Sequence, residues 1–473
     1  MSYRISPGVE LVEARSGPAL LAWTPLRLVT LNAGLAALVR GGRGIVPGSP
    51  AAARALDALQ RRGMLEREPG PRTDPARLPG VSVIVPVKDR AEELRRCLES
   101  LHRLAYPKNR LEILVVDDGS ADHGPRAARS LGARVLSSGG SGLGPAAARN
   151  RGASAATGEI LAFLDSDCLA SERWLADLVE AFADPTVAAV GGRVDGLRTA
   201  SALDRYEAGM SSLSLGGRGR SAGLGSDTFY LPSCNLLVRR AAFLEVGGFR
   251  EELHVGEDVD LSWRLRDRGF TIAYVPRGRV LHEHRNRVAP FLRRRFEYGT
   301  SEGILHALHP ARRKKMVLPT ALVVAGLLAT VACLARAWGP AALGAAIVLL
   351  DAARLWSRLR RELRSAPFRR VLQARLRAST SLVYWVSFHL IRYYGPALIL
   401  ASVAWPRCAA LAAGIALWPA WVDYRAKRPA LLFPSFLAFY AAEHLAYGAG
   451  VFRGCLRQRA FGCYRPVVSR EPS

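Results

Sequence analysis

Three short acidic clusters lie where apolar stretches of the sequence end. They are Asp117-Asp118 after LEILVV, Asp165-Ser166-Asp167 after EILAFL, and Glu257-Asp258 at the start of EDVDLSWRLRDRG. A carboxylate pair at the end of an apolar strand offers the oxygen ligands that Mg²⁺ or Mn²⁺ takes. A cation held there can neutralise a diphosphate leaving group, and a second acidic turn can accept hydrogen bonds from a nucleotide. A single Asp-x-Asp pattern is also common in turns before helices, so the prediction depends on two acidic strand ends occurring together.

The elements that must position these acids lie in residues 81–290, where apolar and amphipathic stretches alternate. The predicted strands are VSVIVPV, LEILVVDD, ARVLSS and EILAFLD, and the predicted helices are AEELRRCLESLHRL, GPAAARNRGASAA and SERWLADLVEAF. This alternation is typical of an α/β fold with a mostly parallel, doubly wound (Rossmann-like) sheet. Because ligands of such sheets bind beyond the carboxyl ends of the strands, the acidic clusters stand at the expected place.

Four segments of this region, in this order, carry a family resemblance. VSVIVPVKDRAEELRRCLESL, VVDDGSAD, AAARNRGASAATGEILAFLDSD and VGGFREELHVGEDVDLSWRLRDRGF resemble the family 2 glycosyltransferases with the GT-A fold. The resemblance covers roughly residues 81–290 and implies inverting transfer of a sugar from a nucleotide diphosphate donor. It also implies Mn²⁺ or Mg²⁺ as the cofactor.

The resemblance assigns a donor site position by position. The residues are Pro86 and Asp89 at its start, Asp117 and Asp118 at the nucleobase and ribose, Arg149 and Asn150 beside the donor, and Asp165 at ribose or metal. It assigns the metal to Asp167 and to His282, with His284 as the alternative ligand. A lone histidine is more often structural. If His282 does bind a metal, its imidazole suits Mn²⁺ better than Mg²⁺.

Asp258 matches the general base of the family. Inversion requires a carboxylate opposite the departing diphosphate, where it takes the proton of the acceptor hydroxyl as the new bond forms. Glu257 either helps to bind the acceptor or only favours the start of a helix electrostatically. The processive members carry a Q-x-x-R-W signature that is replaced here by Ser262-Trp263-Arg264. We therefore expect Trp263 and Arg264 either to bind the acceptor or to pack in the core, and we do not expect long processive synthesis.

The first 65 residues have a hairpin pattern followed by short helices, and their opening RISPGVELVE resembles small PqqD-type winged-helix domains. Such domains recognise a ribosomal precursor peptide, although a cap that binds nothing is the simpler alternative. With this domain, the chain resembles the family of mycofactocin biosynthesis glycosyltransferases over nearly its whole length. That resemblance implies UDP-glucose as donor, the peptide-derived mycofactocin precursor as acceptor and a β-1,4-linked oligoglucose product.

Charge and hydropathy indicate a membrane rather than nucleic acid as the partner. The 473 residues carry a formal charge of +26, yet no aromatic–basic interleaving or reading-helix motif accompanies it. Residues 316–335 and 338–356 are apolar enough to span a bilayer, and further apolar stretches occupy about 380–404, 408–422 and 430–452. We expect four crossings, with interfacial helices as the alternative for the later stretches.

Basic segments at the ends of these spans set the orientation. Nine Lys or Arg fall in 285–315 and nine Arg in 354–377, which predicts a multi-pass inner-membrane protein with its catalytic domain in the cytoplasm. The seven cysteines include no CxxC pair, which fits a reducing compartment. The predicted domains are 1–65 (PqqD-like), 66–80 (linker), 81–290 (GT-A), 291–315 (basic juxtamembrane segment), 316–460 (transmembrane or interfacial helices) and 461–473 (tail).

Two other functions fit parts of this pattern. A membrane glycosyltransferase that extends a lipid-linked or cell-envelope polysaccharide has the same catalytic residues. A non-catalytic, membrane-tethered peptide-binding protein has the same first domain and the same spans, but it does not require the acidic strand ends.

Overall fold

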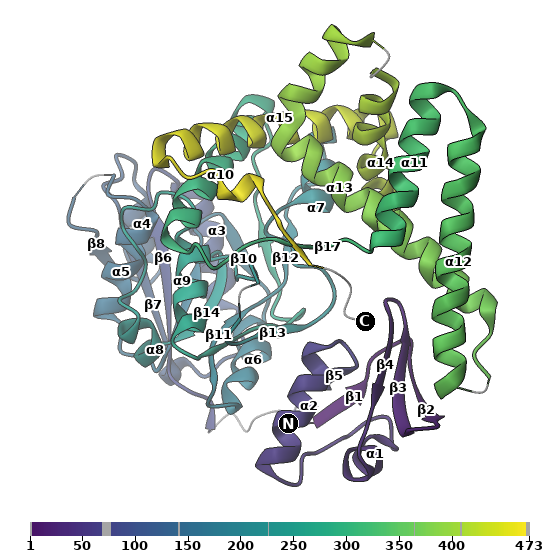
Figure 1. Cartoon of the computed structure of the whole chain (residues 1–473). Coiled ribbons are helices and arrows are strands. Elements are labelled where there is room, and N and C mark those ends of the chain that lie inside the picture. Colours follow the sequence, from purple (N-terminus) through teal and green to yellow (C-terminus); the bar gives the residue numbers. More distant parts are fainter. Residues whose placement is uncertain are drawn as a thin grey trace. The chain divides into compact units, whose positions relative to one another are not determined.

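The computed structural model describes residues 2–68, 77–140, 142–225, 227–363, 365–406 and 409–469 (Figure 1). The chain forms two compact units. One comprises Met1–Gly70, Lys315–Ala426 and Pro466–Ser473, and the other comprises Pro71–Lys314 and Lys427–Arg465. The second unit contains the predicted α/β region together with a segment from near the end of the chain.

An eight-stranded sheet forms the centre of the second unit, in the order β13-β15-β11-β14-β9-β6-β7-β8. Its strands are β6 Val81–Val87, β7 Leu111–Asp117, β8 Arg134–Ser137, β9 Ile160–Leu164, β11 Val187–Gly191, β13 Arg220–Ala222, β14 Asn235–Arg239 and β15 Thr271–Tyr274. β7, β6 and β9 run parallel, whereas β14 runs antiparallel to both β9 and β11. The predicted mostly parallel α/β sheet is confirmed.

Helices cover this sheet on both faces, and each face has its own apolar core. The helices are α3 Ala91–His102, α4 Gly124–Ser130, α5 Pro145–Ala155, α6 Trp174–Val179, α7 Ala202–Met210, α8 Arg240–Glu245 and α9 Glu257–Asp267. The strand residues alternate between the cores: Val83 and Val85 belong to one and Ile84 to the other. Because both faces are covered, the strands read as continuous apolar runs in the sequence.

A second, three-stranded sheet brings the end of the predicted GT-A region beside the Asp-x-Asp turn. β10 (Cys168–Ala170) pairs antiparallel with β16 (Val280–His282), and β12 (Val194–Gly196) pairs with the other side of β16. The register places Cys168 opposite His282. A histidine more than a hundred residues from the acidic turn is thereby fixed next to it.

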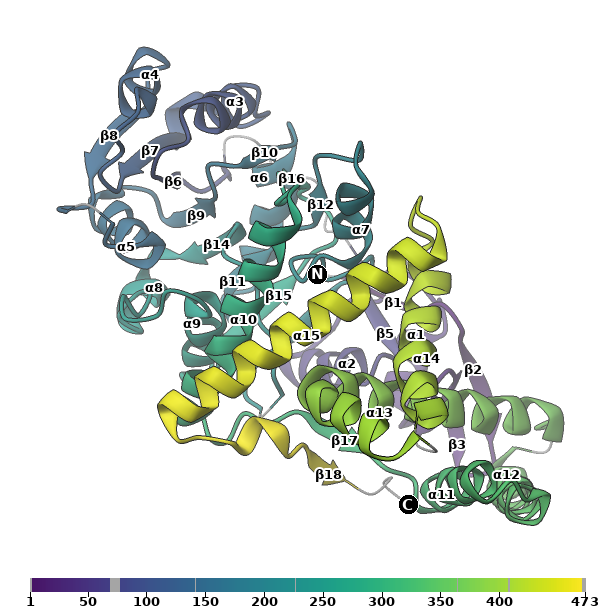
Figure 2. The same ribbon diagram turned by 90° about the horizontal axis from the view of Figure 1, so that it is seen from above.

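Helices α10 (Val288–Leu308) and α15 (Phe433–Gln458) pack closely against each other in the second unit (Figure 2). α10 contains most of the predicted basic juxtamembrane segment, and its Arg295 is buried. α15 contains the stretch 430–452 that the sequence analysis counted among the possible spans. Its buried residues include Glu443 and His444, so one face of this helix packs against protein.

The first unit begins with a small domain. An antiparallel meander is formed by β2 Val9–Ala14, β3 Gly17–Trp23 and β4 Leu26–Thr30. A separate pair is formed by β1 Ser2–Ile5 and β5 Leu65–Glu68. Helices α1 Ala33–Val39 and α2 Pro50–Arg61 come between β4 and β5 in the chain. Ser49 caps α2 by accepting a hydrogen bond from the backbone N–H of Ala52, and Pro50 takes the first helical position. The predicted hairpin followed by short helices is present. The PqqD assignment stays a proposal.

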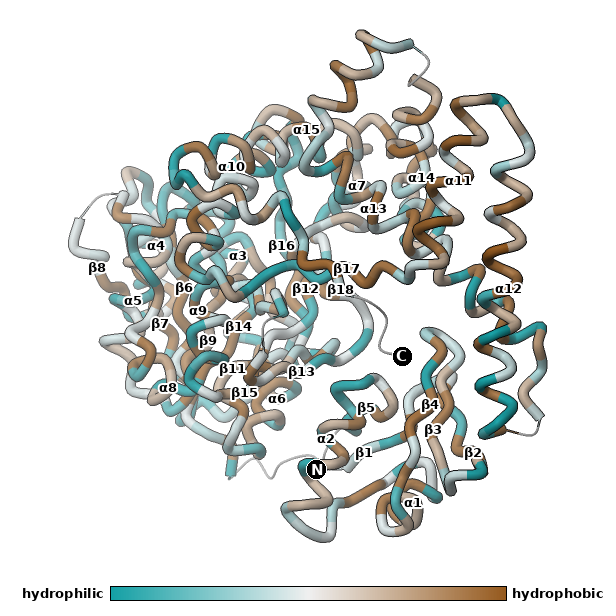
Figure 3. The backbone as a smooth tube through the Cα atoms, in the orientation of Figure 1, coloured by the Kyte–Doolittle hydropathy of each residue, from teal (hydrophilic) through white to brown (hydrophobic). Residues whose placement is uncertain are grey.

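The rest of the first unit is mainly helical. It contains α11 Thr320–Ala335, α12 Trp338–Glu362, α13 Phe368–Ala404 and α14 Ala409–Lys427, and β17 Lys315–Val317 pairs with β18 Val467–Ser469. Among the described residues, one helix, α12, is long and apolar enough to cross a membrane, and α11 is a shorter apolar helix. Figure 3 shows hydrophobic residues along α11 and much of α12, with hydrophilic residues in the last turns of α12.

Candidate active site

A buried arginine joins two of the acidic clusters. Arg149 of α5 donates one hydrogen bond to Asp165, which follows β9, at 2.6 Å and another to Glu257, the first residue of α9, at 2.9 Å. Burial alone would lower the pKa of Arg149, but the two carboxylates raise it above its usual value, so the guanidinium stays charged. The end of β9 and the start of α9 are thus held together by a bridged ion pair.

Asp258 stands next to this bridge but has no cationic hydrogen-bond partner in the described part of the chain. Its carboxylate accepts hydrogen bonds from the backbone N–H groups of Ser233 (3.2 Å) and Val259 (2.8 Å). Burial and the neighbouring Glu257 raise the pKa of Asp258 to about 7. A carboxylate with such a pKa can accept a proton near neutral pH.

Backbone geometry sets both acids in the first turn of α9. Gly256 has φ +86°, which residues with a side chain rarely adopt, and a Cβ atom there would lie 3.1 Å from Ser301 and Leu305. The chain turns at this glycine and enters the helix directly at Glu257. The helix N-terminus favours negative charge, which accounts for part of the acidic composition of this turn.

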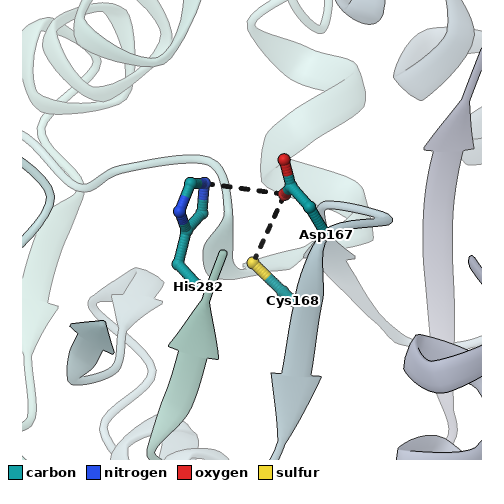
Figure 4. Close-up of side chains that lie close together, drawn as sticks. All are labelled: Asp167, Cys168 and His282. Carbon is teal, nitrogen blue, oxygen red and sulfur yellow. Dashed lines mark hydrogen bonds and ion pairs between the residues drawn. The ribbon is translucent and has the colours of Figure 1, made fainter. Parts of the chain in front are cut away.

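The third group contains Asp167, Cys168 and His282 (Figure 4). One potential ligand atom of each residue lies within 4.8 Å of those of the other two. His282 Nε2 is 3.5 Å from Asp167 Oδ1, and Arg90 forms an ion pair with Oδ2 of the same carboxylate. Burial would raise the pKa of Asp167, but His282 and Arg90 outweigh it, so the pKa lies below its usual value.

This donor set fits a divalent cation. A carboxylate and an imidazole are ligands that Mn²⁺ accepts. Burial raises the pKa of the Cys168 thiol well above its usual value, so this sulfur is a poor ligand compared with the other two groups. The ion pair with Arg90 shows that Asp167 faces positive charge in this structure.

A chain of buried polar residues continues from His282 away from Asp167. His282 Nδ1 is 3.1 Å from His284 Nδ1, which lies 3.7 Å from Glu207 Oε2. Arg295 pairs with Glu207 and lies 3.5 Å from Glu443 of α15. Burial raises the pKa of Glu207 to about 7 and lowers that of His284 to about 3.

The predicted donor residues at the neighbouring strand ends are engaged in local turns. Asp117 accepts a hydrogen bond from the N–H of Ser120, and Asp89 accepts one from the N–H of Ala121. Both oxygens of Asp118 are occupied, because the Ser138 hydroxyl and the N–H groups of Leu143 and Gly144 donate to them. Pro86 lies within β6, one residue before its end. Asp118 therefore holds the turn before α5.

Three other predicted residues are held in packing contacts. The Asn150 side chain forms hydrogen bonds with both the N–H and the C=O of Phe249. Trp263 is buried in edge-to-face contact with His309, and Arg264 binds Asp260 and two backbone carbonyls. For Trp263 and Arg264 these contacts favour the packing alternative over acceptor binding. Both side chains are already engaged within the protein.

Sequence reasoning missed two residues of this site. Arg90 follows Asp89 directly, but its partner Asp167 is distant in sequence. The sequence signal for Arg90 was its position just after a predicted strand. Cys168 follows the Asp-x-Asp turn and meets His282 only through the pairing of β10 with β16. The structure joins Asp165 and Glu257 through Arg149, and it places His282 beside Asp167.

Comparisons with known proteins show the family to which the chain belongs. The model of the family described as Glycosyl transferase family 2 matches residues 82–247. The pre-mycofactocin glycosyltransferase of Mycobacterium tuberculosis is 33% identical over 96% of this chain and 95% of its own length. The chain belongs to the family 2 glycosyltransferases. The resemblance found in its sequence is confirmed, and the protein is a glycosyltransferase.

Other similar proteins cover less of the chain or share less identity with it. Glycosyltransferase AglE of Haloferax volcanii is 31% identical over 42% of this chain and 64% of its own length. A mannosyltransferase from Pyrobaculum calidifontis, solved with GDP-Man and Mn²⁺, has a TM-score of 0.44 at 20% identity and covers 83% of this chain and 93% of its own. The match to the pre-mycofactocin glycosyltransferase, which covers 96% of this chain, extends well beyond the residues 82–247 matched by the family model.

Proposed function

We propose that this glycosyltransferase transfers glucose from UDP-glucose, with inversion, to the peptide-derived precursor of mycofactocin. The observation that carries the proposal is the 33% identity to the Mycobacterium tuberculosis pre-mycofactocin glycosyltransferase over almost the full length of both chains. Repeated transfer would build a β-1,4-linked oligoglucose chain on the acceptor.

In the proposed reaction Asp258 is the general base. It accepts the proton of the acceptor hydroxyl while that oxygen forms a bond to the anomeric carbon and UDP departs from the opposite face. Its position beside the Arg149 bridge supports this role, because Arg149 forms ion pairs with Asp165 and Glu257, whereas among the described residues the Asp258 carboxylate accepts hydrogen bonds from backbone N–H groups. Glu257 keeps Arg149 in place and lies on the acceptor side.

We assign the donor to the strand ends beside this base. Asp117 ends β7 and Asp89 lies in the turn after β6, where a nucleobase and ribose would bind, and Asp165 would contact the ribose or the metal. The Asp118 and Asn150 side chains shape this site by fixing the turn before α5 and the segment around Phe249. Pro86 and Arg149 complete the proposed donor-binding residues.

Asp167 and His282 would hold the divalent cation. Mn²⁺ or Mg²⁺ bound there neutralises the negative charge of the diphosphate leaving group. Among the two ions we favour Mn²⁺, because an imidazole ligand suits it better. Arg90, which pairs with Asp167, would supply further positive charge next to the diphosphate.

The first unit suggests where the acceptor is delivered and where the enzyme resides. The meander and helices of residues 2–61 agree in order with a PqqD-like domain that binds a precursor peptide. Many apolar side chains of α11 to α14 are exposed, which supports contact with a membrane. The multi-pass arrangement with a cytoplasmic catalytic domain is proposed from the basic segments at the ends of the apolar stretches.

Mass spectrometry of the products tests the whole proposal. The purified full chain would be incubated with Mn²⁺, UDP-glucose and the mycofactocin precursor, and we expect products that differ by successive hexose masses. Products formed only on a lipid-linked acceptor would identify an envelope glycosyltransferase instead. Absence of both transfer and donor hydrolysis would indicate a peptide-binding protein.

A further inference from the structure

The two histidines of the segment Val280-Leu281-His282-Glu283-His284 meet through the same type of nitrogen. The Nδ1 atoms of His282 and His284 are 3.1 Å apart, and the ring centroids are separated by 4.7 Å. The other nitrogen of His282, Nε2, is turned toward Asp167. His282 thus has one nitrogen on the side of the proposed cation and one on the side of His284.

His284 is held in this place by buried neighbours. Its side chain is 7% exposed, and so is that of Glu207, whose Oε2 is 3.7 Å from His284 Nδ1. Gly196 of β12 lies beside the ring, since a Cβ atom there would lie 3.4 Å from His284 Cδ2. Arg295 fixes Glu207 from the other side. The imidazole of His284 therefore has little freedom to turn.

The contact between His282 and His284 fits the chemistry of a metal-bound imidazole. A histidine that binds a cation through Nε2 presents its lone pair there and carries its proton on Nδ1. That proton needs an acceptor, and outer partners of this kind fix the ring and the tautomer of the ligand. In the described part of the chain, His282 Nδ1 lies within hydrogen-bond distance of His284 Nδ1.

We propose that His284 is a positioning residue that accepts the Nδ1 proton of His282 and so directs the Nε2 lone pair of His282 toward the cation. This inference rests on the proposed function, because it takes Asp167 and His282 as the cation ligands. His284 then carries its own proton on Nε2, which is buried without a partner among the described residues. A buried N–H without a hydrogen-bond acceptor costs free energy, and cation binding must offset this cost.

The alternative that His284 is itself a ligand has less geometric support. The cluster with ligand atoms close enough to share a cation contains Asp167, Cys168 and His282, and not His284. The Nδ1 atom of His284 faces the nitrogen of His282 that is turned away from Asp167. A side-chain carbonyl oxygen in place of His284 Nδ1 should therefore serve as well, since the His282 Nδ1–H needs only a hydrogen-bond acceptor.

Mn²⁺ titration followed by electron paramagnetic resonance tests the inference on the full chain without donor or acceptor. We expect His284→Leu to weaken Mn²⁺ binding about 10–100-fold, the usual effect of removing an outer partner of a metal ligand. His284→Gln keeps an acceptor and should bind within a few fold of the unchanged protein. His102→Leu is the matched control, because His102 is exposed at the end of α3 and its ring contacts the Leu131 carbonyl, away from the proposed cation ligands.

Pulsed resonance spectra of bound Mn²⁺ separate positioning from ligation. One coupled histidine nitrogen, retained in His284→Gln and lost in His282→Ala, would support the inference. Coupling to two histidine nitrogens, or undiminished affinity in His284→Leu while His282→Ala loses it, would overturn the inference but leave the proposed function standing. Unchanged Mn²⁺ affinity in both Asp167→Ala and His282→Ala would overturn the metal assignment and the inference together.

Discussion

Two adjacent carboxylates at the start of α9 differ because only one of them has a cationic partner. Glu257 is bound by the buried Arg149, whereas Asp258 receives only backbone N–H groups. The uncompensated charge of Asp258 is costly in a buried setting, and its pKa rises to about 7. This contrast separates a positioning acid from one that can exchange a proton.

Replacement of the proposed base should stop transfer without stopping donor binding. We expect Asp258→Asn to lower the transfer rate by about 10²–10⁴-fold, the usual contribution of a general base, with UDP affinity unchanged by calorimetry. The matched control is Asp177→Asn on α6, which removes only a surface pair with Arg173. Loss of UDP affinity in Asp258→Asn would contradict the assigned role.

The same substitution should not weaken the fold at alkaline pH. The folded pKa of Asp258 lies above the unfolded value, so stability falls as the pH rises from about 4 to about 7 and the full cost of ionisation is present above 7. The amide removes that cost, and Asp258→Asn should melt at an equal or higher temperature at pH 8. A lower melting temperature would mean that lost activity reports lost structure.

The pH dependence of the reaction follows from the same carboxylate. A base must be ionised to accept a proton, so kcat/KM should fall about tenfold for each pH unit below about 7 and level off above it. Rates measured from pH 5 to pH 9 at saturating Mn²⁺ check this. Asp258→Asn should lack the acidic limb. A profile that is flat from pH 5 to pH 9 would exclude Asp258 as the titrating base.

Removal of Asp167, the proposed metal-binding carboxylate, should weaken donor binding in the presence of Mn²⁺. Asp167→Ala takes away an oxygen ligand and leaves Arg90 without its ion-pair partner. We expect the increase in UDP affinity that Mn²⁺ produces to be largely lost, as measured by calorimetry at several Mn²⁺ concentrations. Asp195→Asn, which removes an ion pair with Arg193, serves as the control. An undiminished Mn²⁺ effect in Asp167→Ala would contradict the assignment.

At the scale of the elements, close contact between backbones determines the place of α15. Gly450 and Gly454 of this helix face Gly299 and Gly303 of α10, and a Cβ atom on any of them would lie within 2.5 Å of backbone atoms of the other helix. Small residues four apart on both helices permit this approach. Buried polar contacts add to it, since Tyr206 donates a hydrogen bond to Glu443 at 2.8 Å.

A methyl group at this crossing should destabilise the second unit. A Cβ atom at Gly450 would lie 2.0 Å from the carbonyl oxygen of Phe296, so Gly450→Ala should lower the free energy of unfolding by about 1–3 kcal/mol. The matched control is Gly209→Ala in α7, where the added atom meets neighbours at 3.7 Å and helix propensity improves. Denaturant unfolding of the full chain compares the two, and equal stability would show that α10 and α15 do not pack this closely.

At the scale of the whole molecule, exposed apolar helices must find a partner other than water. Leu327 of α11 and Leu350 of α12 are 62% and 59% exposed, in helices of 16 and 25 residues. Apolar surface of this extent marks a membrane or protein interaction site. The last turns of α12 carry Arg360 and Arg361, as expected at the cytoplasmic end of a span.

Membrane association can be tested on these two side chains. The full chain should float with liposomes and resist extraction at alkaline pH. The double variant Leu327→Lys and Leu350→Lys should be extracted, because each lysine at a helix centre costs about 2.5–3.5 kcal/mol of insertion. Leu244→Lys on the exposed side of α8 is the control. Retention of the double variant in the membrane fraction would contradict membrane insertion of α11 and α12.

The sequence by itself determined the strands, the helices between them and the positions of the acids. In runs such as VSVIVPV every residue but Ser82 is apolar because both faces of β6 are covered, and this signal is local. The acids at the ends of β7 and β9 follow from the same local pattern. The family motifs then predicted that Asp165, Asp167 and Asp258 act together.

Only the tertiary structure decided the partners of these acids. Arg149 pairs with Glu257 across 108 residues, and His282 reaches Asp167 through the pairing of β16 with β10. It also decided that α15 packs against α10 and that Trp263 lies in the core, which apolar composition could not distinguish from a span or a sugar platform. Local periodicity reports which face of an element is buried, whereas the identity of its neighbour depends on contacts between residues distant in the chain.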